Sequence, residues 1–405
     1  MRGRMGALRP VRDGGGSGDV MALSSGGPEA PGIPAAMPYL PQLDGVRAVA
    51  ALIVFVAHAG FSHVVPGGFG VTIFFFLSGY LITTLLRIER ARTGRVSLPA
   101  FYLRRTLRIL PPMYLTLLLS GALYALGLMD RRVDAAAVIG QATFLTNYPA
   151  LWGTEQVLPV PLWSLAIEEH FYLVFPLAYA LWLGRRSPGR AALICLGLCA
   201  IVLGLRGLNV WRLPDYSLNY SWTHTRIDAI LFGCCLGLWQ NPVCPGPGGR
   251  VWAPRPWQVA AAVAVILGTL LVRDEAFRQS LRYTLQSAAL FVLFAWILQG
   301  RGPVVRIFAA APMRRLGLYS YSFYLVHASV FDVVAHLAPG LGRLATMAAS
   351  FILTLAYAAL IHAAVERPCA RLRRSLLDDG ARPPEPSLAD GARAGPGVAP
   401  PLTRA

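Results

Sequence analysis

The run that decides the fold class begins Leu43-Asp44-Gly45-Val46-Arg47-Ala48-Val49-Ala50 and continues Ala51-Leu52-Ile53-Val54-Phe55-Val56-Ala57-His58. It is apolar enough for a membrane-spanning helix, yet it carries three ionisable side chains. Eleven residues at roughly 100° each place His58 within about 20° of Arg47, with about 16 Å of rise between them, and Asp44 falls on nearly the same stripe. Because ionisable groups are costly in lipid, this stripe should face the interior of a helix bundle and serve a function. The alternative is an Asp44–Arg47 pair at the membrane surface and a solitary, hydrogen-bonded His58.

The composition of the whole chain supports a membrane protein. Of its 405 residues, 55% are hydrophobic and only 14% are charged. Several apolar runs reach the roughly 20 residues that cross a bilayer. We therefore predict an all-α polytopic integral membrane protein, with about ten transmembrane helices in one bundle. The predicted spans are 43–62, 68–86, 108–127, 161–183, 190–206, 225–240, 257–272, 283–299, 316–336 and 344–365.

The strong positive charge has a topological explanation. The formal net charge is +17, and all 37 basic side chains are arginines. They fall in short loops between apolar segments, with no soluble basic domain that would present a groove to nucleic acid, so we predict no nucleic-acid partner. The loop 87–108 and the other Arg-rich loops lie on one side, which the positive-inside rule assigns to the cytoplasm. This places the protein in the cytoplasmic membrane, in contact with its lipids, with both termini cytoplasmic.

The chain divides into three parts. We expect a disordered cytoplasmic N-terminal extension over 1–38, a transmembrane domain over 39–370 and a disordered cytoplasmic C-terminal tail over 371–405, because both ends are rich in Pro, Gly, Ala and Arg. The weakly apolar segment 134–148 is expected to be interfacial or re-entrant. The six cysteines show no metal-ligand spacing, so no metal is predicted.

An arginine cluster precedes the third span. Arg104, Arg105 and Arg108 lie at spacings of three and four residues, so on a helix they form one cationic face. Arginine presents a planar fork that suits phosphate, which favours a phosphate-bearing ligand. The alternative is attraction to anionic lipid, which any inner loop would show.

The fourth span opens with costly polar residues. Trp163-Ser164-Leu165-Ala166-Ile167 leads into Glu168-Glu169-His170-Phe171-Tyr172. By helical rise Glu168 lies roughly 10 Å from the outer end of its helix, a depth comparable to that of His58. A carboxylate beside an imidazole supports a general base, so we expect Glu168 to face inward and to support His58.

Two further polar groups leave alternatives open. Arg226 and Asp228 begin the sixth span and could pair with each other or with Glu168. A structural ion-pair network and a catalytic one are both consistent with this spacing. His327 lies near the middle of the ninth span, where a lone histidine is more often a hydrogen-bonded core residue than a catalyst.

Taken together, these motifs resemble acyltransferase family 3, whose membrane-bound members O-acylate lipopolysaccharide, peptidoglycan, exopolysaccharide and macrolides. The resemblance covers about residues 39–370. It rests on these motifs in this order: Asp44 with Arg47 and His58, Phe75-Phe76-Leu77-Ser78-Gly79, Arg105-x-x-Arg108, Trp163-Ser164-Leu165 with Glu168 and Phe171-Tyr172, Arg226 with Asp228, and Ser320-Tyr321-x-Phe323-Tyr324-Leu325-x-His327.

The resemblance implies an O-acyltransferase. The enzyme would move an acyl group, for which we predict acetyl, from acyl-CoA to a hydroxyl of a glycan, a lipid-linked sugar or a macrolide. Acyl-CoA would enter from the cytoplasm as a co-substrate, with no bound cofactor. His58 would be the essential base, and both direct transfer and an acyl-histidine intermediate remain open.

Each candidate residue then has an expected place. His58, Glu168, Arg47 and Asp44 form the expected catalytic group. Arg104, Arg105 and Arg108 would hold the phosphates of coenzyme A. The other residues expected to line the site are Ser78, Trp163, Ser164, Tyr172, Arg226, Asp228, Tyr324 and His327.

The main alternative is a transporter of an anionic glycan or lipid without acyl-transfer activity. The same buried charges would then line a transport path. The sequence shows no internal inverted repeat or paired broken helices, which are typical of many transporters. A polyprenyl-phosphate glycosyltransferase is a weaker alternative, because the outer loops are poor in carboxylates.

Overall fold

The computed structural model describes residues 33–34, 36–153, 156–246, 249–300 and 302–379. All regular structure within these ranges is helical, which confirms the predicted all-α class. Most of the predicted N-terminal extension, and the predicted tail from residue 380 onward, lie outside the described residues.

Each predicted span coincides with a helix. These helices are α1 (Pro41–Val56), α2 (Gly67–Thr93), α3 (Leu98–Ala125), α5 (Leu162–Leu181), α6 (Pro188–Arg212), α8 (Asp228–Leu238), α9 (Pro256–Leu271), α11 (Leu281–Gln299), α13 (Ala311–Leu337) and α14 (Arg343–Ile361). Short helices connect them: α4 (Ala135–Ala142), α7 (Thr223–Arg226), α10 (Glu275–Gln279) and α12 (Pro303–Phe308).

Six helical segments in the described part of the chain are long and apolar enough to cross a membrane. They are Pro41–Phe61, Gly67–Thr93, Leu98–Ala125, Pro188–Arg212, Leu281–Gln299 and Arg343–Leu377. Helices α8 and α9 are apolar but shorter, and α5 and α13 are not among the six. These helices identify a membrane protein, whereas the predicted number of ten crossings is not confirmed.

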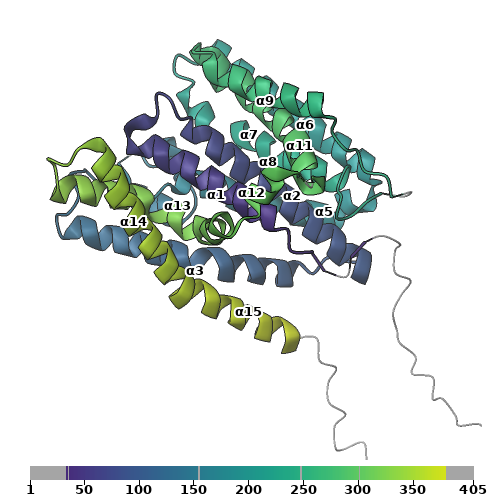
Figure 1. Ribbon diagram of the computed structural model, residues 1–405, viewed down its shortest axis with the longest axis horizontal. Helices are drawn as coiled ribbons and strands as arrows, with labels where there is room; N and C mark the ends of the chain where they lie inside the picture. Colours follow the sequence, from purple (N-terminus) through teal and green to yellow (C-terminus); the bar gives the residue numbers. More distant parts are fainter. Residues whose placement is uncertain (1–32, 35, 154–155, 247–248, 301, 380–405) are drawn as a thin grey trace, which may run out of the picture.

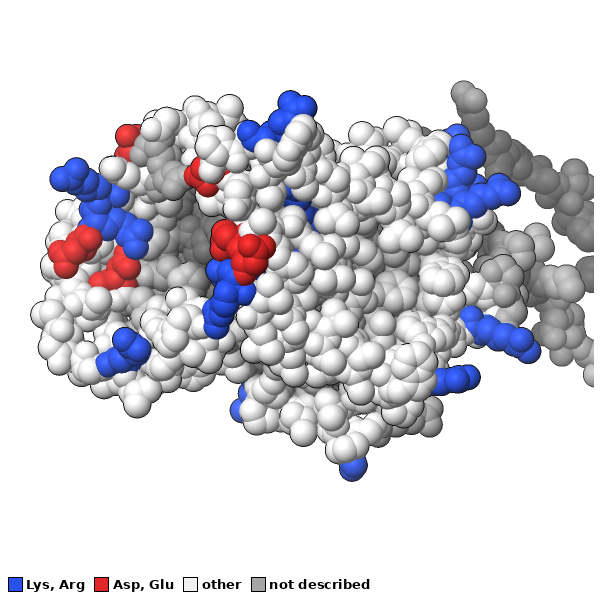
Figure 2. Space-filling view, turned by 90° about the horizontal axis from the view of Figure 1, so that it is seen from above, with Lys and Arg blue, Asp and Glu red and all other residues white. Residues whose placement is uncertain are grey.

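The long helices run back and forth between two ends of one bundle (Figure 1). At one end, which we call the His58 end, Arg131 pairs with Asp332 at 2.6 Å. At the other, which we call the basic end, Arg104 at the start of α3 pairs with Glu89 at the end of α2. On the face shown in Figure 2, acidic side chains gather towards the His58 end, whereas the basic end shows arginines alone.

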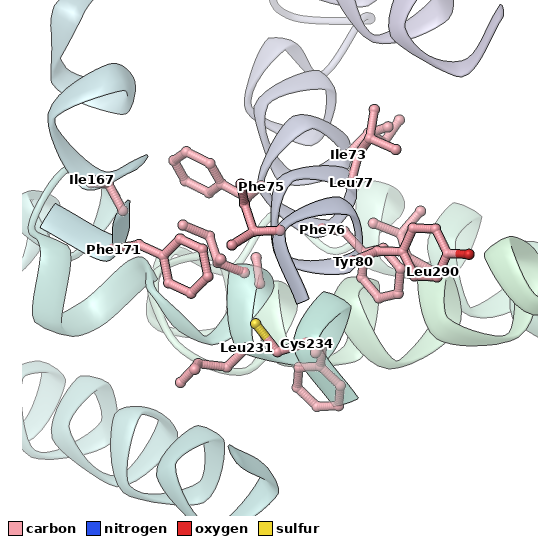
Figure 3. Close-up of a cluster of buried hydrophobic side chains, with 14 of the residues drawn as sticks. Ile73, Phe75, Phe76, Leu77, Tyr80, Ile167, Phe171, Leu231, Cys234 and Leu290 are labelled. Carbon is pink, nitrogen blue, oxygen red and sulfur yellow. The ribbon is translucent and has the colours of Figure 1, made fainter. Parts of the chain in front are cut away.

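Helix α2 is the centre of the hydrophobic core. Its apolar side chains interlock with those of α5, α8 and α11 around Phe76 and Leu77 (Figure 3). The crossing of α2 and α8 depends on glycine, because a Cβ on Gly79 would collide with the carbonyl of Ile230, and one on Gly233 with that of Phe76. This close contact fixes α2, and with it the polar side chains that α2 presents to its other neighbours.

Helix α1 ends in a π-helical turn, Ala57–Phe61, that contains His58. Single π turns within α-helices redirect a side chain and are frequent at functional sites. Gly60 then adopts a positive φ of 90°, a conformation that glycine tolerates without strain. The chain can therefore turn sharply after His58, and the imidazole lies at the mouth of the bundle.

One predicted boundary is wrong. Residues 371–379, which we assigned to the disordered tail, continue helix α15 (Arg367–Asp379). This helix packs against α3 at the basic end. Leu372 and Leu376 recur at a helical spacing among arginines, and this gives α15 an apolar face and a basic one. The overall Pro and Arg richness of the tail concealed this local periodicity.

Candidate functional site

Two cavities meet inside the bundle. The Glu168 cavity occupies about 890 Å³ and is lined from α1, α2, α3, α5 and α13. The His58 cavity occupies about 1460 Å³ and opens at the His58 end. Val71 and Tyr324 line both cavities, so they form the partition between them.

A hydrogen-bonded chain runs along one wall of the Glu168 cavity. The Ser78 and Tyr172 hydroxyls lie 2.5 Å apart, and the Tyr172 hydroxyl donates to Oε2 of Glu168 at 3.1 Å. Ser78 comes from α2, whereas the other two residues lie one turn apart on α5. All three predicted residues are thus brought together, and Glu168 faces inward as expected.

Three arginines surround this carboxylate. Arg47, Arg105 and Arg108 line the Glu168 cavity, in which Glu168 is the one acidic lining residue. Arg47 also pairs with Asp44 at 3.4 Å, and the Arg105 guanidinium lies 5.4 Å from the Tyr172 ring centroid. The cavity therefore has an excess of positive charge and suits an anionic group.

Arg104 does not share this cavity. The sequence predicted one cationic face for Arg104, Arg105 and Arg108, but Arg104 turns towards α2 and pairs with Glu89 at 3.0 Å. The helical spacing of the arginines predicts which face of the helix they share. It does not show that one of them will form an ion pair with a carboxylate from another helix. The cluster at the cavity is therefore made by Arg47, Arg105 and Arg108.

His58 lies in the second cavity. Its side chain is exposed there and also borders a neighbouring cavity on the side of Trp152. Nδ1 lies 2.9 Å from the carbonyl oxygen of Val54. Because a carbonyl can only accept, Nδ1 carries the proton, and in the neutral form of the ring Nε2 then keeps its lone pair. The backbone of α1 thus prepares His58 to accept a proton at Nε2.

The expected support of His58 by Glu168 is not present. Glu168 bonds to Tyr172 and lies among arginines of the other cavity, and among the described residues no hydrogen bond joins it to His58. The rise per residue gives the depth of Glu168 and of His58 along their own helices. It does not show which neighbouring helix each side chain faces. The Val54 carbonyl performs the orienting role that we assigned to Glu168.

The imidazole of His327 contacts that of His58. Their ring centroids lie 4.7 Å apart in an edge-to-face arrangement. His327 is buried, and its Nδ1 lies 2.6 Å from the Tyr324 carbonyl, so Nδ1 is the donor. Its Nε2 has no hydrogen-bond partner. His327 thus has the hydrogen-bonded, buried position that was one of the two alternatives, and it also packs directly against the imidazole of His58. We propose that it positions that ring.

Replacing His327 by phenylalanine should therefore lower acyl-transfer turnover about ten- to a hundredfold while leaving the KM for the acyl donor unchanged. The ring remains but its nitrogen atoms are lost, and small displacements of a reacting group are costly. Steady-state kinetics on the purified variant would measure turnover and the KM for the acyl donor separately. His336→Phe, at the same end of α13, is the matched control. A rise in donor KM with unchanged turnover would contradict the positioning role.

Tyr324 closes the partition between the two cavities. Its hydroxyl lies 2.7 Å from that of Ser164, and its ring contacts Phe74 and His327. Trp163, the neighbour of Ser164, turns into the His58 cavity and packs on Tyr220. The start of α5 thus contributes to both cavities.

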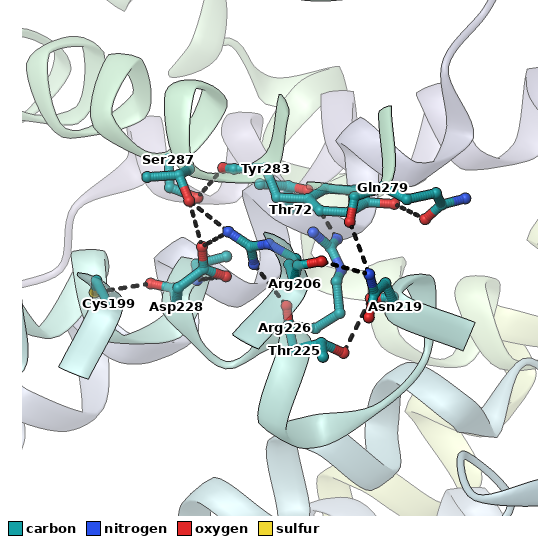
Figure 4. Close-up of polar contacts among 12 residues, drawn as sticks. Thr72, Cys199, Arg206, Asn219, Thr225, Arg226, Asp228, Gln279, Tyr283 and Ser287 are labelled. Atoms are coloured by element: carbon teal, nitrogen blue, oxygen red, sulfur yellow. Dashed lines mark hydrogen bonds and ion pairs between the residues drawn. The ribbon is translucent and has the colours of Figure 1, made fainter. Parts of the chain in front are cut away.

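Arg226 and Asp228 take other partners than expected (Figure 4). Asp228 pairs with Arg206 of α6 at 2.7 Å, and both side chains are fully buried. Arg226 donates to Thr72 at 3.1 Å, and its guanidinium lies 3.8 Å from the Tyr283 ring centroid. Arg206 is the last residue of the predicted span 190–206, and its carboxylate partner lies on another helix, so the sequence did not indicate this pair.

Asp228→Ala should destabilise the protein by about 3–5 kcal/mol, because it leaves Arg206 buried without a counter-charge. The midpoint temperature of thermal unfolding of the purified protein and the amount of protein recovered from membranes would both fall. Asp215→Ala, a change in the exposed segment between α6 and η4 (Ser217–Tyr220), is the matched control. If the Asp228→Ala protein keeps its thermal stability, another group must balance the buried charge of Arg206.

Comparison with known proteins agrees with these motifs. The model of the acyltransferase domain family matches residues 40–363. The peptidoglycan O-acetyltransferase OatA of Listeria monocytogenes is 30% identical over 317 residues, which are 71% of this chain and 49% of that protein. The O-acetyltransferase OatA of Staphylococcus aureus is 29% identical over 313 residues, which are 71% of this chain and 50% of that protein. No solved structure matches the chain significantly.

The family match spans most of the chain, so the chain belongs to the acyltransferase domain family, and the resemblance seen in the sequence is confirmed. The chain spans about half the length of the curated relatives it matches.

Proposed function

We propose that this protein is an O-acetyltransferase that uses acetyl-CoA as donor and a hydroxyl of a cell-envelope glycan as acceptor. The observation that carries this proposal is the pair of cavities on either side of Tyr324 and Val71. One has the arginines that a phosphate-bearing donor requires, and the other has an imidazole prepared to accept a proton. The O-acetyltransferase names of the relatives support acetyl and a glycan.

The reaction assigns a task to each side. Arg105 and Arg108 hold the phosphates of coenzyme A, and the pantetheine arm extends past Arg47 towards Tyr324. Nε2 of His58 takes the proton of the acceptor hydroxyl, and the oxygen attacks the thioester carbonyl. The carbon–sulfur bond then breaks, and the proton passes from His58 to the departing thiolate. This direct route needs no acyl-histidine.

Glu168 has a different task from the one first expected. With Tyr172 and Ser78 it forms the polar wall of the donor cavity, where its carboxylate balances part of the charge of three arginines. The carboxylate offsets part of the mutual repulsion of the arginines when no donor is bound. Glu168 therefore acts on donor binding and not on the imidazole.

The two ends of the bundle imply two compartments. The basic end carries the Arg-rich loops and is assigned to the cytoplasm, where acetyl-CoA is made. His58 then lies towards the outer surface, where a glycan too polar to cross the membrane is modified in place. A macrolide acceptor is less consistent with this arrangement.

Sealed membrane vesicles of known orientation test the proposal. With labelled acetyl-CoA confined to the cytoplasmic side, we expect label on a glycan confined to the opposite side. Vesicles that contain the His58→Ala protein are the control. Label only on acceptors that share the cytoplasmic face with the donor would contradict transfer across the membrane, and no labelled acceptor on either side would contradict the activity itself.

The transport alternative has no comparable support. The buried Arg206–Asp228 pair lines neither of the two cavities and is held within the packing of α6, α8 and α11. Asp228, one of the buried charges that could have lined a path, thus belongs to a structural network instead.

A further inference from the structure

Three arginines line the His58 cavity. Arg273 follows α9, Arg278 lies in α10, and Arg282 lies in the first turn of α11. All three line the cavity, and no lining residue is acidic. A cavity that the proposed function reserves for the acceptor thus carries positive charge of its own, separate from the donor cavity.

Two of these arginines lack a carboxylate partner. Arg273 donates to the carbonyl of His63 at 3.3 Å, and Arg282 donates to the Tyr283 hydroxyl at 3.3 Å. Within the described ranges neither forms an ion pair. Arg278 does pair with Glu275, at 3.0 Å, but this pair is partly exposed, and such pairs contribute little to stability.

A further positive charge lies against the lining of this cavity. Arg226 is fully buried against Tyr283 and Tyr220, two residues that line the cavity. Its neighbouring carboxylate, Asp228, is occupied by Arg206, and Nε and Nη1 of Arg226 have no hydrogen-bond partner (Figure 4). A charge inside the protein is poorly screened, so it adds to the positive potential of the cavity.

The same cavity offers an aromatic surface. Trp163 and Tyr220 lie with ring centroids 4.6 Å apart, next to the backbone of Gly68, where a Cβ would come within 3.0 Å of the Tyr220 ring. Binding sites for organic ligands commonly combine such apolar surfaces with a few polar groups that fix orientation. A sugar ring on this surface would lie in the same cavity as His58 and the arginines.

We propose that Arg273 and Arg282, assisted by Arg278, form an anion subsite of the His58 cavity, so that the acceptor is a glycan bearing a carboxylate or phosphate. The subsite holds this acidic group while the neighbouring hydroxyl faces Nε2 of His58. The inference rests on the proposed function, which it deepens by naming the acceptor class. The subsite contributes to acceptor binding and not to donor binding, since neither Arg273 nor Arg282 lines the donor cavity.

The experiment uses the purified full-length protein, labelled acetyl-CoA and cell-envelope glycan from the producing organism in three forms. One form is untreated, one has its carboxylates amidated by carbodiimide, and one has its phosphates removed by hydrofluoric acid. We expect the wild type to lose about ten- to a hundredfold in apparent acceptor affinity on one of the treated forms, the range for a lost charge-assisted contact. Which treatment acts identifies the acidic group.

Arginine variants connect this loss to the subsite. The double variant Arg273→Gln/Arg282→Gln should show the same loss on untreated glycan, no further loss on the treated form, and an unchanged KM for acetyl-CoA. Arg212→Gln, an exposed arginine at the same end that lines neither cavity, is the matched control. Arg273→Lys/Arg282→Lys should recover part of the affinity.

Each alternative result has a definite meaning. If the wild type acetylates treated and untreated glycans with equal affinity, or if the double variant matches the wild type on untreated glycan, the subsite is wrong while the proposed function stands. If the wild type binds acetyl-CoA but transfers acetyl to none of the three forms, the proposed glycan activity is wrong, and the subsite falls with it.

Discussion

His58→Gln should lower acetyl transfer by at least about a hundredfold, the minimum typical of a lost general base. Glutamine has a similar size and can still donate a hydrogen bond to the Val54 carbonyl, but it cannot accept a proton. The KM for acetyl-CoA should not change, because the donor arginines line the other cavity. Transfer of labelled acetyl to the glycan measures the effect.

His63→Gln provides the matched control, since His63 lines the same cavity without contacting His327. It should retain turnover within a fewfold. Gel filtration and thermal unfolding of both variants would show that the fold is intact. Turnover of the His58→Gln protein near that of the wild type would remove His58 from the role of base.

Simultaneous replacement of Arg105 and Arg108 by alanine should raise the KM for acetyl-CoA by about a hundredfold or more. Each charge-assisted phosphate contact is worth roughly 1.5–3 kcal/mol, or about ten- to a hundredfold in affinity. Lysine at both positions keeps the charge but loses the fork, and should recover only part of the affinity. Direct binding of coenzyme A to the purified protein measures the effect without an acceptor.

Arg104→Ala is the decisive control, because Arg104 belongs to the same sequence cluster but pairs with Glu89 outside the cavity. We expect it to change donor affinity by less than about threefold, within the range for a partly exposed ion pair. A loss equal to that of Arg105→Ala would mean that the whole cluster binds the donor. If the variant with alanine at both Arg105 and Arg108 has an unchanged KM for acetyl-CoA, these arginines do not bind the donor and serve only to orient the protein in the membrane.

The sequence alone determined the class and the list of candidates. Apolar runs of spanning length predicted helices that the structure contains, because burial of a backbone in lipid leaves few alternatives to the helix. The stripe from Arg47 to His58 predicted an inward-facing surface, and the structure places its two ends in adjoining cavities. The ordered motifs were sufficient to indicate the family, which the domain match confirms.

The sequence failed where the outcome depended on which helix lies next to which. Periodicity fixes the angle of a side chain about its own axis but carries no information about the neighbouring helix. Thus Glu168 was predicted beside His58, whereas it bonds to Tyr172 in the cavity that the arginines line. Arg104 was predicted at the donor site, whereas it pairs with Glu89.

Only the tertiary structure decided the partners of the buried charges and the separation of the two cavities. Arg206 and Asp228 are far apart in sequence, and their pairing depends on how closely α6 and α8 pack. The partition at Tyr324 arises because α13 and α5 bring two hydroxyls within hydrogen-bonding distance. The physical reason is the same in each case: a buried charge or hydroxyl must find a partner, and in this bundle the partner is often on another helix.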